Sequence, residues 1–527
     1  MNHSEFEGDV VVRSASANPI PATGAKPRLQ AGGNSGRGIN VAAYVAVWCG
    51  AVSVAVLLLA LAVRLPWNGD LGLHAAVIER LRANLLHPGN PMVDAAIESP
   101  YYSPWTVLQA LVAKATGLGT FTVLRLAALV SVALLLSGIW RFTRVLSTHR
   151  AAPPVALLCL TLLWGPPLFA WSGLLELGSL AIAISYPSTF IVALAFHFWA
   201  SLHKALRRPA SWLLFTVLGA LWGVMLLVHQ FSGMIATFGA VAVVVAARPG
   251  REIWLRVIAG ILAGTVVALT WPYYSLFALL GNNSLDPWSA ALYEHLPSRL
   301  VLMVPGVVAL WFRFMKDRRD PLVIFFVLGA ATVGYGWLFA HWSWGRALPA
   351  VLIPAQLAIA LTVVAVPKRA VRETLCGLLV IAFAFGAWTQ STALGYVVAP
   401  EHLPAALREK AWPSWQGYAW TRRWVGYGET VMTSQAIAFQ LPAHGAYTVA
   451  PAFPDPFLDD SQARWDATNL YFSPISSRNE RLAALHRYHV SWVLQQPGQQ
   501  GGLSPLDPAL SKTATGPGGE VLYHVIR

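Results

Sequence analysis

The stretch VAAYVAVWCGAVSVAVLLLALAVRLPWNGD, residues 41–70, joins a long apolar run to a carboxylate that follows it closely. Residues 41–63 carry no charged side chain, and an apolar helix of this length can cross the hydrocarbon core of a bilayer. Because the run is too long for the core of a signal peptide, we expect it to be a retained first transmembrane span. Asp70 would then lie where the chain leaves the membrane and meets water.

The composition of the whole chain is that of a membrane protein. Of its 527 residues, 56% are hydrophobic and only 12% are charged, which excludes an ordinary soluble enzyme. Residues 1–40 are polar and rich in Gly, Ser and Pro, so we expect a disordered tail. Cys49, Cys159 and Cys376 each lie inside an apolar run, which argues against disulfides and cysteine metal sites.

The basic residues are grouped in clusters between the apolar runs. The net charge is +13, but this clustering is typical of cytoplasmic loops, so we expect no nucleic-acid partner. Placing all the clusters inside the cell predicts an odd number of spans and a cytoplasmic N-terminus in a multi-pass cell-membrane protein. The clusters fall within residues 26–37, 141–150, 204–208, 248–256, 313–319 and 368–372.

Eleven spans fit this arrangement of charge. They are predicted at residues 41–63, 121–140, 154–171, 180–200, 212–229, 232–247, 254–271, 299–313, 321–340, 347–366 and 371–390. The transmembrane domain then covers residues 41–391, and residues 64–120 form a long first outer loop. Residues 392–527 are predicted to lie outside as well, because an odd number of spans separates them from the N-terminus.

The first outer loop begins with a predicted helix. Apolar residues recur at helical spacing between residues 71 and 86, which predicts a short helix lying along the membrane interface. Asp70 would be its N-cap residue, and His74 lies one turn further on. Two interpretations of Asp70 follow: a helix cap without a chemical role, or a functional carboxylate.

The same loop continues with an acidic and aromatic segment, NPMVDAAIESPYYSPW, residues 90–105. Glu98 lies just before Tyr101 and Tyr102, and two prolines bracket the tyrosines, which predicts a rigid aromatic turn. This turn would be either part of an interfacial aromatic belt or a platform for a sugar.

Further ionisable residues lie near the outer ends of other predicted spans. His341 and Arg346 belong to HWSWGR, on the side where basic residues are disfavoured, so we favour a function for Arg346 over the anchoring of a span end. Glu176 would line an acceptor groove or lie at the interface as a shallow glutamate. His229 and Gln230 are expected to be buried hydrogen-bonding groups.

The chain changes character after about residue 392. The segment ETVMTSQAIAFQLPAHGAYTVAP predicts strand, short helix and strand, RNERLAALHRYHVSWVLQQ predicts helix then strand, and EVLYHVIR predicts a last strand. We therefore expect a small α/β domain outside the membrane. It contains no Gly-rich phosphate loop and no paired catalytic acids, and we expect structural support as its default role.

Taken together, these features resemble the GT-C superfamily of membrane glycosyltransferases. The strings WNGDLGLHAAVIERL, NPMVDAAIESPYYSPW and HWSWGRALP are similar to those of bacterial, actinobacterial members, and the resemblance covers about residues 41–527. It implies a GT-C-like helical membrane protein that uses a polyprenyl-phosphate sugar donor at the outer face. The family's acid in the first outer loop corresponds to Asp70. Several branches carry two adjacent acids there, whereas Asp70 is flanked by Gly69 and Leu71, so the resemblance leaves metal dependence open.

The resemblance implies a hexosyl- or pentosyltransferase of the inverting type, which acts on a cell-envelope glycan, lipid or protein in cell-wall biogenesis. Asp70 would be the catalytic base for the acceptor hydroxyl. Positive charge for the departing phosphate would come from Arg346, from His341 or His74, or from a divalent metal ion shared by Asp70 and Glu98. The predicted substrate-binding residues are His74, Glu98, Tyr101, Tyr102, Glu176, His341 and Arg346.

Two other classes of protein share this hydropathy pattern. A transporter or lipid flippase would concentrate ionisable residues or broken helices near the middle of the membrane, often in two related halves, and neither pattern is clear in this sequence. A non-catalytic assembly protein of envelope biogenesis would have the same topology without needing Asp70. The sequence alone does not separate this last class from an enzyme.

Overall fold

The computed structural model describes residues 41–526 apart from residues 167–168, 208–210, 280, 413 and 415–416. The tail at residues 1–40, predicted to be disordered, lies outside the described residues. Residues 45–527 form one compact unit.

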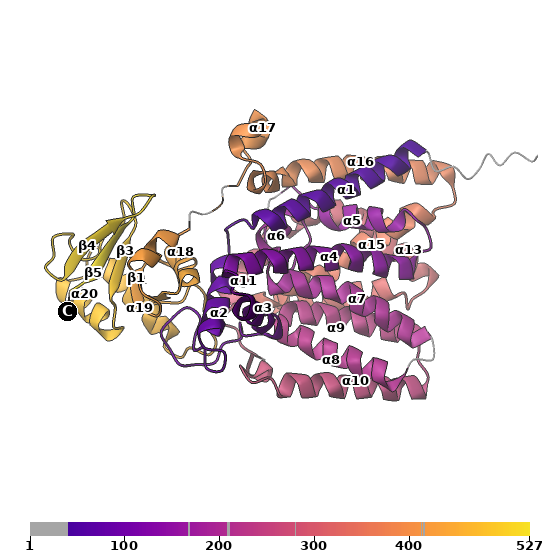
Figure 1. Ribbon diagram of the computed structural model, residues 1–527. Helices are drawn as coiled ribbons and strands as arrows, with labels where there is room; N and C mark the ends of the chain where they lie inside the picture. The colour runs from indigo at the N-terminus through magenta and orange to yellow at the C-terminus, as the bar shows by residue number, and fades with distance from the viewer. Residues whose placement is uncertain are drawn as a thin grey trace, which may run out of the picture. The chain divides into compact units, whose positions relative to one another are not determined.

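Within the described residues, nine helical segments are long and apolar enough to cross a membrane, and two shorter apolar helices accompany them. Figure 1 shows these helices lying alongside one another. All eleven predicted spans have a counterpart in this set, which confirms a multi-pass helical membrane protein. The helices are α1 (Val41–Arg64), α4 (Thr120–Leu146), α5 (Ala152–Leu162), α7 (Pro187–Arg207), α8 (Trp212–Val228), α9 (Gln230–Ala247), α10 (Arg251–Leu269), α13 (Val304–Lys316), α14 (Pro321–Leu338), α15 (Leu348–Ala365) and α16 (Arg369–Thr389).

The helices differ in how deeply they are buried. Nearly all side chains of α15 are buried within the bundle, whereas α10 and α16 bury few of theirs, as expected of helices that face lipid. Helix α10 packs on α8 through facing glycines, because Gly219 approaches the backbone of Gly260 and Gly223 approaches that of Gly264. A side chain at either contact would force these two helices apart.

The first outer loop contains helices α2 (Leu71–Ala83) and α3 (Pro104–Thr116). Helix α2 begins directly after Asp70, as predicted, and ends three residues earlier than expected. Ten of its thirteen residues are buried in protein, so α2 has no broad exposed face, and its placement along the membrane interface stays a prediction. Val77, Ile78 and Leu81 belong to one apolar core that also includes Ala443 and Leu458 of the C-terminal region.

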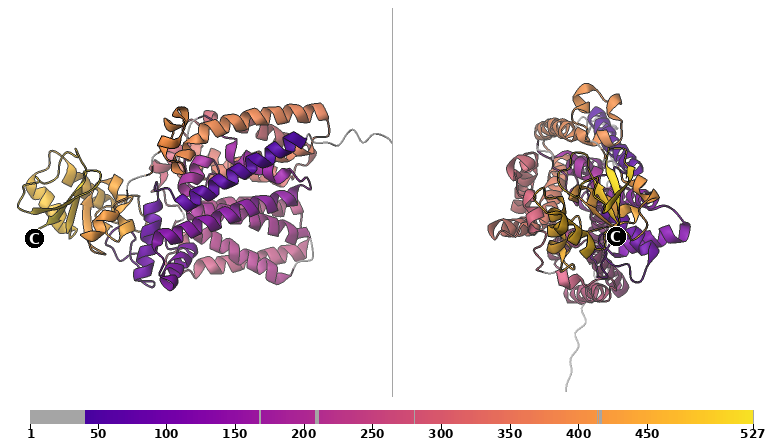
Figure 2. Two further views of the ribbon diagram at one scale, coloured as in Figure 1. Left: turned by 45° about the horizontal axis from the view of Figure 1, so that its top comes forward. Right: turned by 90° about the vertical axis from the view of Figure 1, so that its left-hand side faces the viewer.

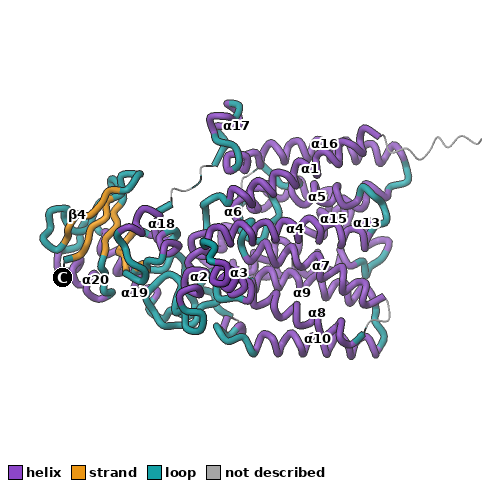
Figure 3. The backbone as a smooth tube through the Cα atoms, in the orientation of Figure 1, coloured by secondary structure: helices purple, strands orange, loops and turns teal. Residues whose placement is uncertain are grey.

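The C-terminal region forms the expected α/β domain, and Figure 3 shows its strands gathered in one part of the chain. The sheet order is β2-β1-β3-β5-β4, with β1 parallel to β2 and β3 and with β5 antiparallel to β3 and β4. Every predicted strand and helix is present, while helix α19 and strand β4 were not predicted. The elements are β1 (Thr430–Thr433), α18 (Gln435–Ala438), β2 (Tyr447–Thr448), α19 (Ser461–Phe472), α20 (Arg478–Arg487), β3 (Trp492–Gln495), β4 (Leu510–Thr515) and β5 (Val521–Val525).

The sheet domain is attached to the first outer loop, beyond the ends of the spanning helices (Figure 2). The buried Arg80 of α2 donates to the carbonyl oxygens of Gly445 at 2.9 Å and Ala446 at 2.7 Å. The Asn90 amide donates to the Asp455 carboxylate at 2.7 Å. These contacts hold the segment around Asp455 against the first outer loop, close to the cavity described below.

Candidate active site

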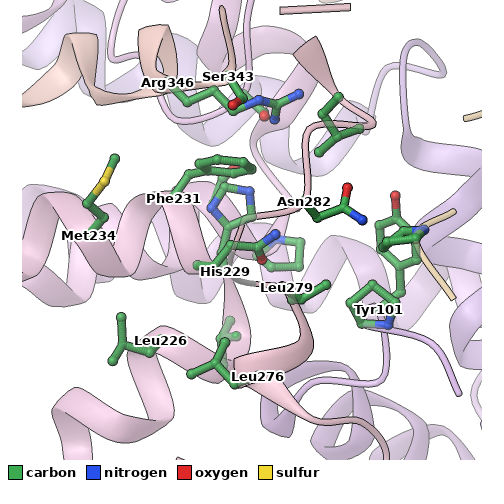
Figure 4. A pocket seen from close by; sticks show the side chains of 18 of the residues that line it. Tyr101, Leu226, His229, Phe231, Met234, Leu276, Leu279, Asn282, Ser343 and Arg346 are labelled. Atoms are coloured by element: carbon green, nitrogen blue, oxygen red, sulfur yellow. The ribbon is translucent and has the colours of Figure 1, made fainter. Parts of the chain in front are cut away.

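A cavity of about 750 Å³ lies where the predicted first outer loop, the ends of several spans on the same side and the sheet domain meet. Its apolar wall comes from the spans and from the segment that follows α10, and Figure 4 shows Leu226, Met234 and Leu276 in it. Its polar wall comes mainly from the outer segments. The polar lining residues include Asp70, His74, Tyr101, Ser172, His229, Gln230, Asn282, His341, Ser343 and Arg346.

Asp70 occupies the N-cap position of α2 without acting as a cap. Its side chain makes no capping hydrogen bond, and within the described residues its carboxylate has no hydrogen-bond or ion-pair partner. The capping interpretation therefore lacks the contact that it requires. The carboxylate instead lines the cavity.

The residues just before Asp70 fix its position. Gly69 has a φ of +52°, a left-handed conformation that favours glycine, and a Cβ there would lie 3.0 Å from the Tyr186 hydroxyl oxygen. The Tyr186 hydroxyl donates to the Asn68 carbonyl oxygen at 2.9 Å, and the Asn68 amide donates to the Tyr396 hydroxyl at 2.7 Å. Asp70 is thus held rigidly at the cavity wall.

Burial changes the acid strength of Asp70. Burial raises the pKa of Asp70 to about 6, and the nearby positive charge of Arg346 opposes part of this rise. Burial likewise raises the pKa of Tyr101, and the negative charges of Asp455 and Asp70 add to this effect. Asp70 is therefore a stronger base than an ordinary aspartate, and it is still mostly ionised at neutral pH.

His74 lines the cavity one turn after Asp70. Its side chain is only 8% exposed, its Nδ1 atom has no hydrogen-bond partner within the described residues, and its ring centroid lies 4.6 Å from that of Tyr186. Burial lowers the pKa of His74 to about 3. Burial therefore disfavours the imidazolium form that the predicted cationic role of His74 needs, and it favours a contact between a neutral imidazole and a substrate.

Arg346 is held in the cavity wall with part of its guanidinium unused. Its Nε atom donates to the Ser289 hydroxyl at 3.2 Å, and its Cζ atom lies 4.6 Å from the ring centroid of Phe231 and 5.3 Å from that of Trp171. No partner of its two terminal nitrogens is found within the described residues. These donors are available to an anion in the cavity.

His341 precedes the turn that carries Arg346, and its imidazole contacts an acidic side chain. Its Nδ1 atom is 3.7 Å from the Asp286 carboxylate, which also accepts the Ser343 backbone N–H at 2.7 Å. These contacts fix the turn η4 (Trp342–Ala347), which carries Arg346. The main function of His341 in this geometry is to help shape that turn, although its ring borders the cavity.

Three predicted site residues lie outside the cavity lining. Glu98 is exposed and is not among the residues that line the cavity. Tyr102 is buried, and its hydroxyl donates to the Gly89 carbonyl oxygen at 2.7 Å, a structural contact. Glu176 is buried beside a separate, much smaller cavity, where it accepts the Ser179 hydroxyl at 2.8 Å and where burial raises its pKa to about 8. The structure does not bring these three residues to the cavity lining, and their substrate-binding roles stay predictions.

The sequence interpretation missed several cavity residues. His229 and Gln230 were expected to be buried hydrogen-bonding groups, and both border the cavity. Phe453 and Pro454 of the sheet domain also border it, and nothing in their local sequence pattern connects them to the first outer loop. The position of His229 at the outer end of a span was the one signal that could have identified it.

The side chains around the cavity give little support to the predicted divalent metal ion. The described residues contain no group of three or more His, Cys, Asp or Glu side chains that could hold a metal ion. Glu98, the second ligand that the sequence suggested, is not in the cavity lining. These residues do not fit a metal centre, and we assign no reaction step to one.

Comparison with known proteins identifies the fold. No protein-family model matches the chain, and no curated protein matches its sequence. Among solved structures, the arabinofuranosyltransferase AftD from Mycobacteria is similar at a TM-score of 0.59 and 16% identity, over 91% of this chain and 40% of AftD. ArnT from Cupriavidus metallidurans bound to undecaprenyl phosphate is similar at a TM-score of 0.52 and 14% identity, over 90% of this chain and 97% of ArnT. The chain therefore has the same fold as these two proteins, as its resemblance to the GT-C superfamily predicted, although it spans less than half of AftD.

Proposed function

We propose that this protein is a membrane glycosyltransferase that transfers a sugar from a polyprenyl-phosphate donor to a hydroxyl group of a cell-envelope glycan, lipid or protein. The observation that carries the proposal is that Asp70 and Arg346 line one cavity, each with polar atoms that have no partner among the described residues. A carboxylate and a guanidinium in one cavity supply the base and the anion-binding group that such a transfer needs.

The two residues act at opposite ends of the reacting centre. The Asp70 carboxylate accepts the proton of the acceptor hydroxyl while the acceptor oxygen forms a bond to the anomeric carbon of the sugar. The bond between that carbon and the phosphate oxygen breaks, and the polyprenyl phosphate leaves with its electron pair. The Arg346 guanidinium stabilises the charge that develops on this phosphate. A single displacement of this kind inverts the configuration at the anomeric carbon.

The lipid nature of the donor is supported by the cavity walls and by the fold. Trp222, Leu226 and Met234 line the cavity next to its polar wall, so an isoprenoid chain could lie along them while its phosphate reaches Arg346. ArnT, which shares this fold, has been solved with undecaprenyl phosphate bound. The predicted topology, with the N-terminus inside and the first outer loop and sheet domain outside, would place this reaction at the outer face.

A comparison of cell-envelope glycans tests the proposal. Cells without the protein should lack a defined sugar residue by mass spectrometry, and the wild-type protein should restore it, whereas an equally abundant Asp70→Asn variant should not. Restoration by Asp70→Asn would favour a non-catalytic assembly protein or a transporter and would contradict an enzymatic role.

A further inference from the structure

His229 connects α8 and α9 and has a structural role that constrains its chemistry. It is the last flanking residue of α8 and the N-cap of α9, with an extended backbone conformation. Its Nδ1 atom accepts the Ser232 backbone N–H at 3.1 Å and lies 2.9 Å from the Ser232 hydroxyl oxygen. The imidazole thus caps α9 in the way that an aspartate or asparagine usually caps a helix.

This cap determines which ring nitrogen carries the proton. A backbone N–H is only a donor, so the Nδ1 atom that receives it must be unprotonated. In a neutral imidazole the proton then resides on Nε2. A second proton on Nδ1 would point at the Ser232 backbone N–H, which is itself a donor. His229 is therefore a neutral side chain whose Nε2–H is available as a donor. Within the described residues, no hydrogen-bond partner of Nε2 is found.

The Nε2–H group belongs to the same part of the cavity wall as Arg346. Phe231 lies on the first turn of α9, with its ring centroid 6.0 Å from that of His229 and 4.6 Å from the Arg346 Cζ atom. Figure 4 shows His229 and Phe231 next to each other, with Arg346 beyond Phe231. All three residues line the cavity. The Phe231 ring therefore lies between the neutral donor of His229 and the charged guanidinium of Arg346.

We propose that His229 donates its Nε2–H to the phosphate of the lipid donor and, with Arg346, forms a two-part phosphate-binding site. This inference rests on the proposed function, because it assigns a second ligand to the phosphate of that donor. A neutral donor suits this place, because a second cation beside Arg346 would repel it when the site is empty. The cap fixes the imidazole before the lipid binds, so little side-chain entropy is lost on binding.

Two substitutions separate the phosphate contact from the helix cap. In His229→Asn, the side-chain amide coincides with the Nδ1 region, so this variant keeps a good cap but loses the distant donor. In His229→Gln, the amide nitrogen reaches the Nε2 region, so this variant keeps the donor but weakens the cap. A phosphate role and a purely structural role therefore predict opposite orders for the two variants.

The measurement is the affinity of the purified full-length protein for undecaprenyl phosphate, with undecaprenol, which lacks the phosphate, as the matched control lipid. We expect His229→Asn to weaken undecaprenyl phosphate binding about tenfold or more, and His229→Gln to weaken it less than about threefold. Neither substitution should change the affinity for undecaprenol. Thermal unfolding should show the reverse order, with His229→Gln the less stable variant.

Two results would overturn the assignment. Wild-type affinity of His229→Asn for undecaprenyl phosphate would show that His229 only caps α9, and equal weakening of undecaprenol binding would show a loss of packing rather than of a phosphate contact. A sugar-transfer assay separates this inference from the proposed function. If wild-type protein binds undecaprenyl phosphate in a manner that depends on His229 but transfers no sugar, the phosphate site stands and the transferase function fails.

Discussion

Asp70 lies just before helix α2 and Arg80 lies near its end, and the surroundings of their two charges differ. The charge of Arg80 has several hydrogen-bond partners, whereas that of Asp70 has none among the described residues. Arg80 is fully buried and donates to the carbonyl oxygens of Pro91, Gly445 and Ala446, with its Cζ atom 3.6 Å from the Tyr447 ring centroid. Asp70 faces a cavity without a partner among the described residues. A charge whose hydrogen bonds are complete stabilises the fold, whereas a charge left incomplete beside a cavity is available to a substrate.

The largest effect should follow from removing the Asp70 charge. Asp70→Asn keeps the size of the side chain but cannot accept the acceptor's proton, so the transfer rate should fall about 10²- to 10⁴-fold. Its stability should not fall. Because burial raises the pKa of Asp70 from 3.8 to about 6, the free energy of unfolding falls as pH rises between these two values, and the full cost of the buried charge is present above about pH 6. Asparagine does not ionise, so the variant lacks this cost. Transfer assays measure the expected loss of rate, and thermal unfolding at neutral pH measures the expected stability of the variant. A marked loss of stability in Asp70→Asn would contradict the account.

The next effect should follow from Arg80→Met, and it should be an effect on stability. The substitution leaves three carbonyl oxygens without their donor, which should lower the free energy of unfolding by about 3 kcal/mol. The matched control is Arg82→Met on the same helix. This variant loses a partly exposed pair with Glu79 at 3.6 Å and a long hydrogen bond to the Thr120 hydroxyl at 3.4 Å, and the change should stay below about 1 kcal/mol. Equal thermal unfolding midpoints for the two variants would contradict the claim that the buried hydrogen bonds of Arg80 stabilise the fold.

Arg346→Gln should weaken the use of the donor rather than the fold. Loss of charge-assisted hydrogen bonds to the phosphate should raise the donor KM roughly 10- to 100-fold. Arg82→Gln, which removes an arginine outside the cavity lining, is the control and should leave the donor KM unchanged. An unchanged donor KM in Arg346→Gln would place the phosphate elsewhere.

The smallest effects should come from Glu98→Gln and Glu176→Gln. Glu98 is exposed outside the cavity lining, and Glu176, with its pKa raised to about 8 by burial, is mostly protonated at neutral pH and already resembles glutamine. Steady-state transfer rates should therefore change less than about twofold for either variant. A large loss with Glu98→Gln would restore the interpretation that Glu98 binds a substrate or a metal ion.

The sequence was sufficient for the spans and for the two main charges of the site. Apolar runs and basic clusters identify the helices without any knowledge of their packing, because each span must satisfy its own backbone in lipid. Asp70 was selected through the resemblance to the family's acid in the first outer loop, and Arg346 because basic residues are disfavoured on the predicted outer side. Their roles in the site stay proposals.

The remaining features depend on contacts between distant segments. Local sequence predicts α2 from its apolar spacing but does not say that the sheet domain packs against it. Strand β4, Leu510–Thr515, was missed because most of its side chains are polar or exposed, as is common in an edge strand. The donor at His229 Nε2 follows only from the hydrogen bond that occupies Nδ1, which no sequence pattern indicates.

The pH dependence of kcat/KM for sugar transfer by the unaltered protein tests the central claim most directly, because it requires no substitution that could disturb the fold. Asp70 must be ionised to act as the base, and burial raises its pKa to about 6. The donor is a phosphodiester and does not titrate in this range. We predict that kcat/KM falls about tenfold for each pH unit below about 6 and is constant above it. A value of kcat/KM that stays constant from about pH 4.5 to 8 would contradict the assignment of Asp70 as the base.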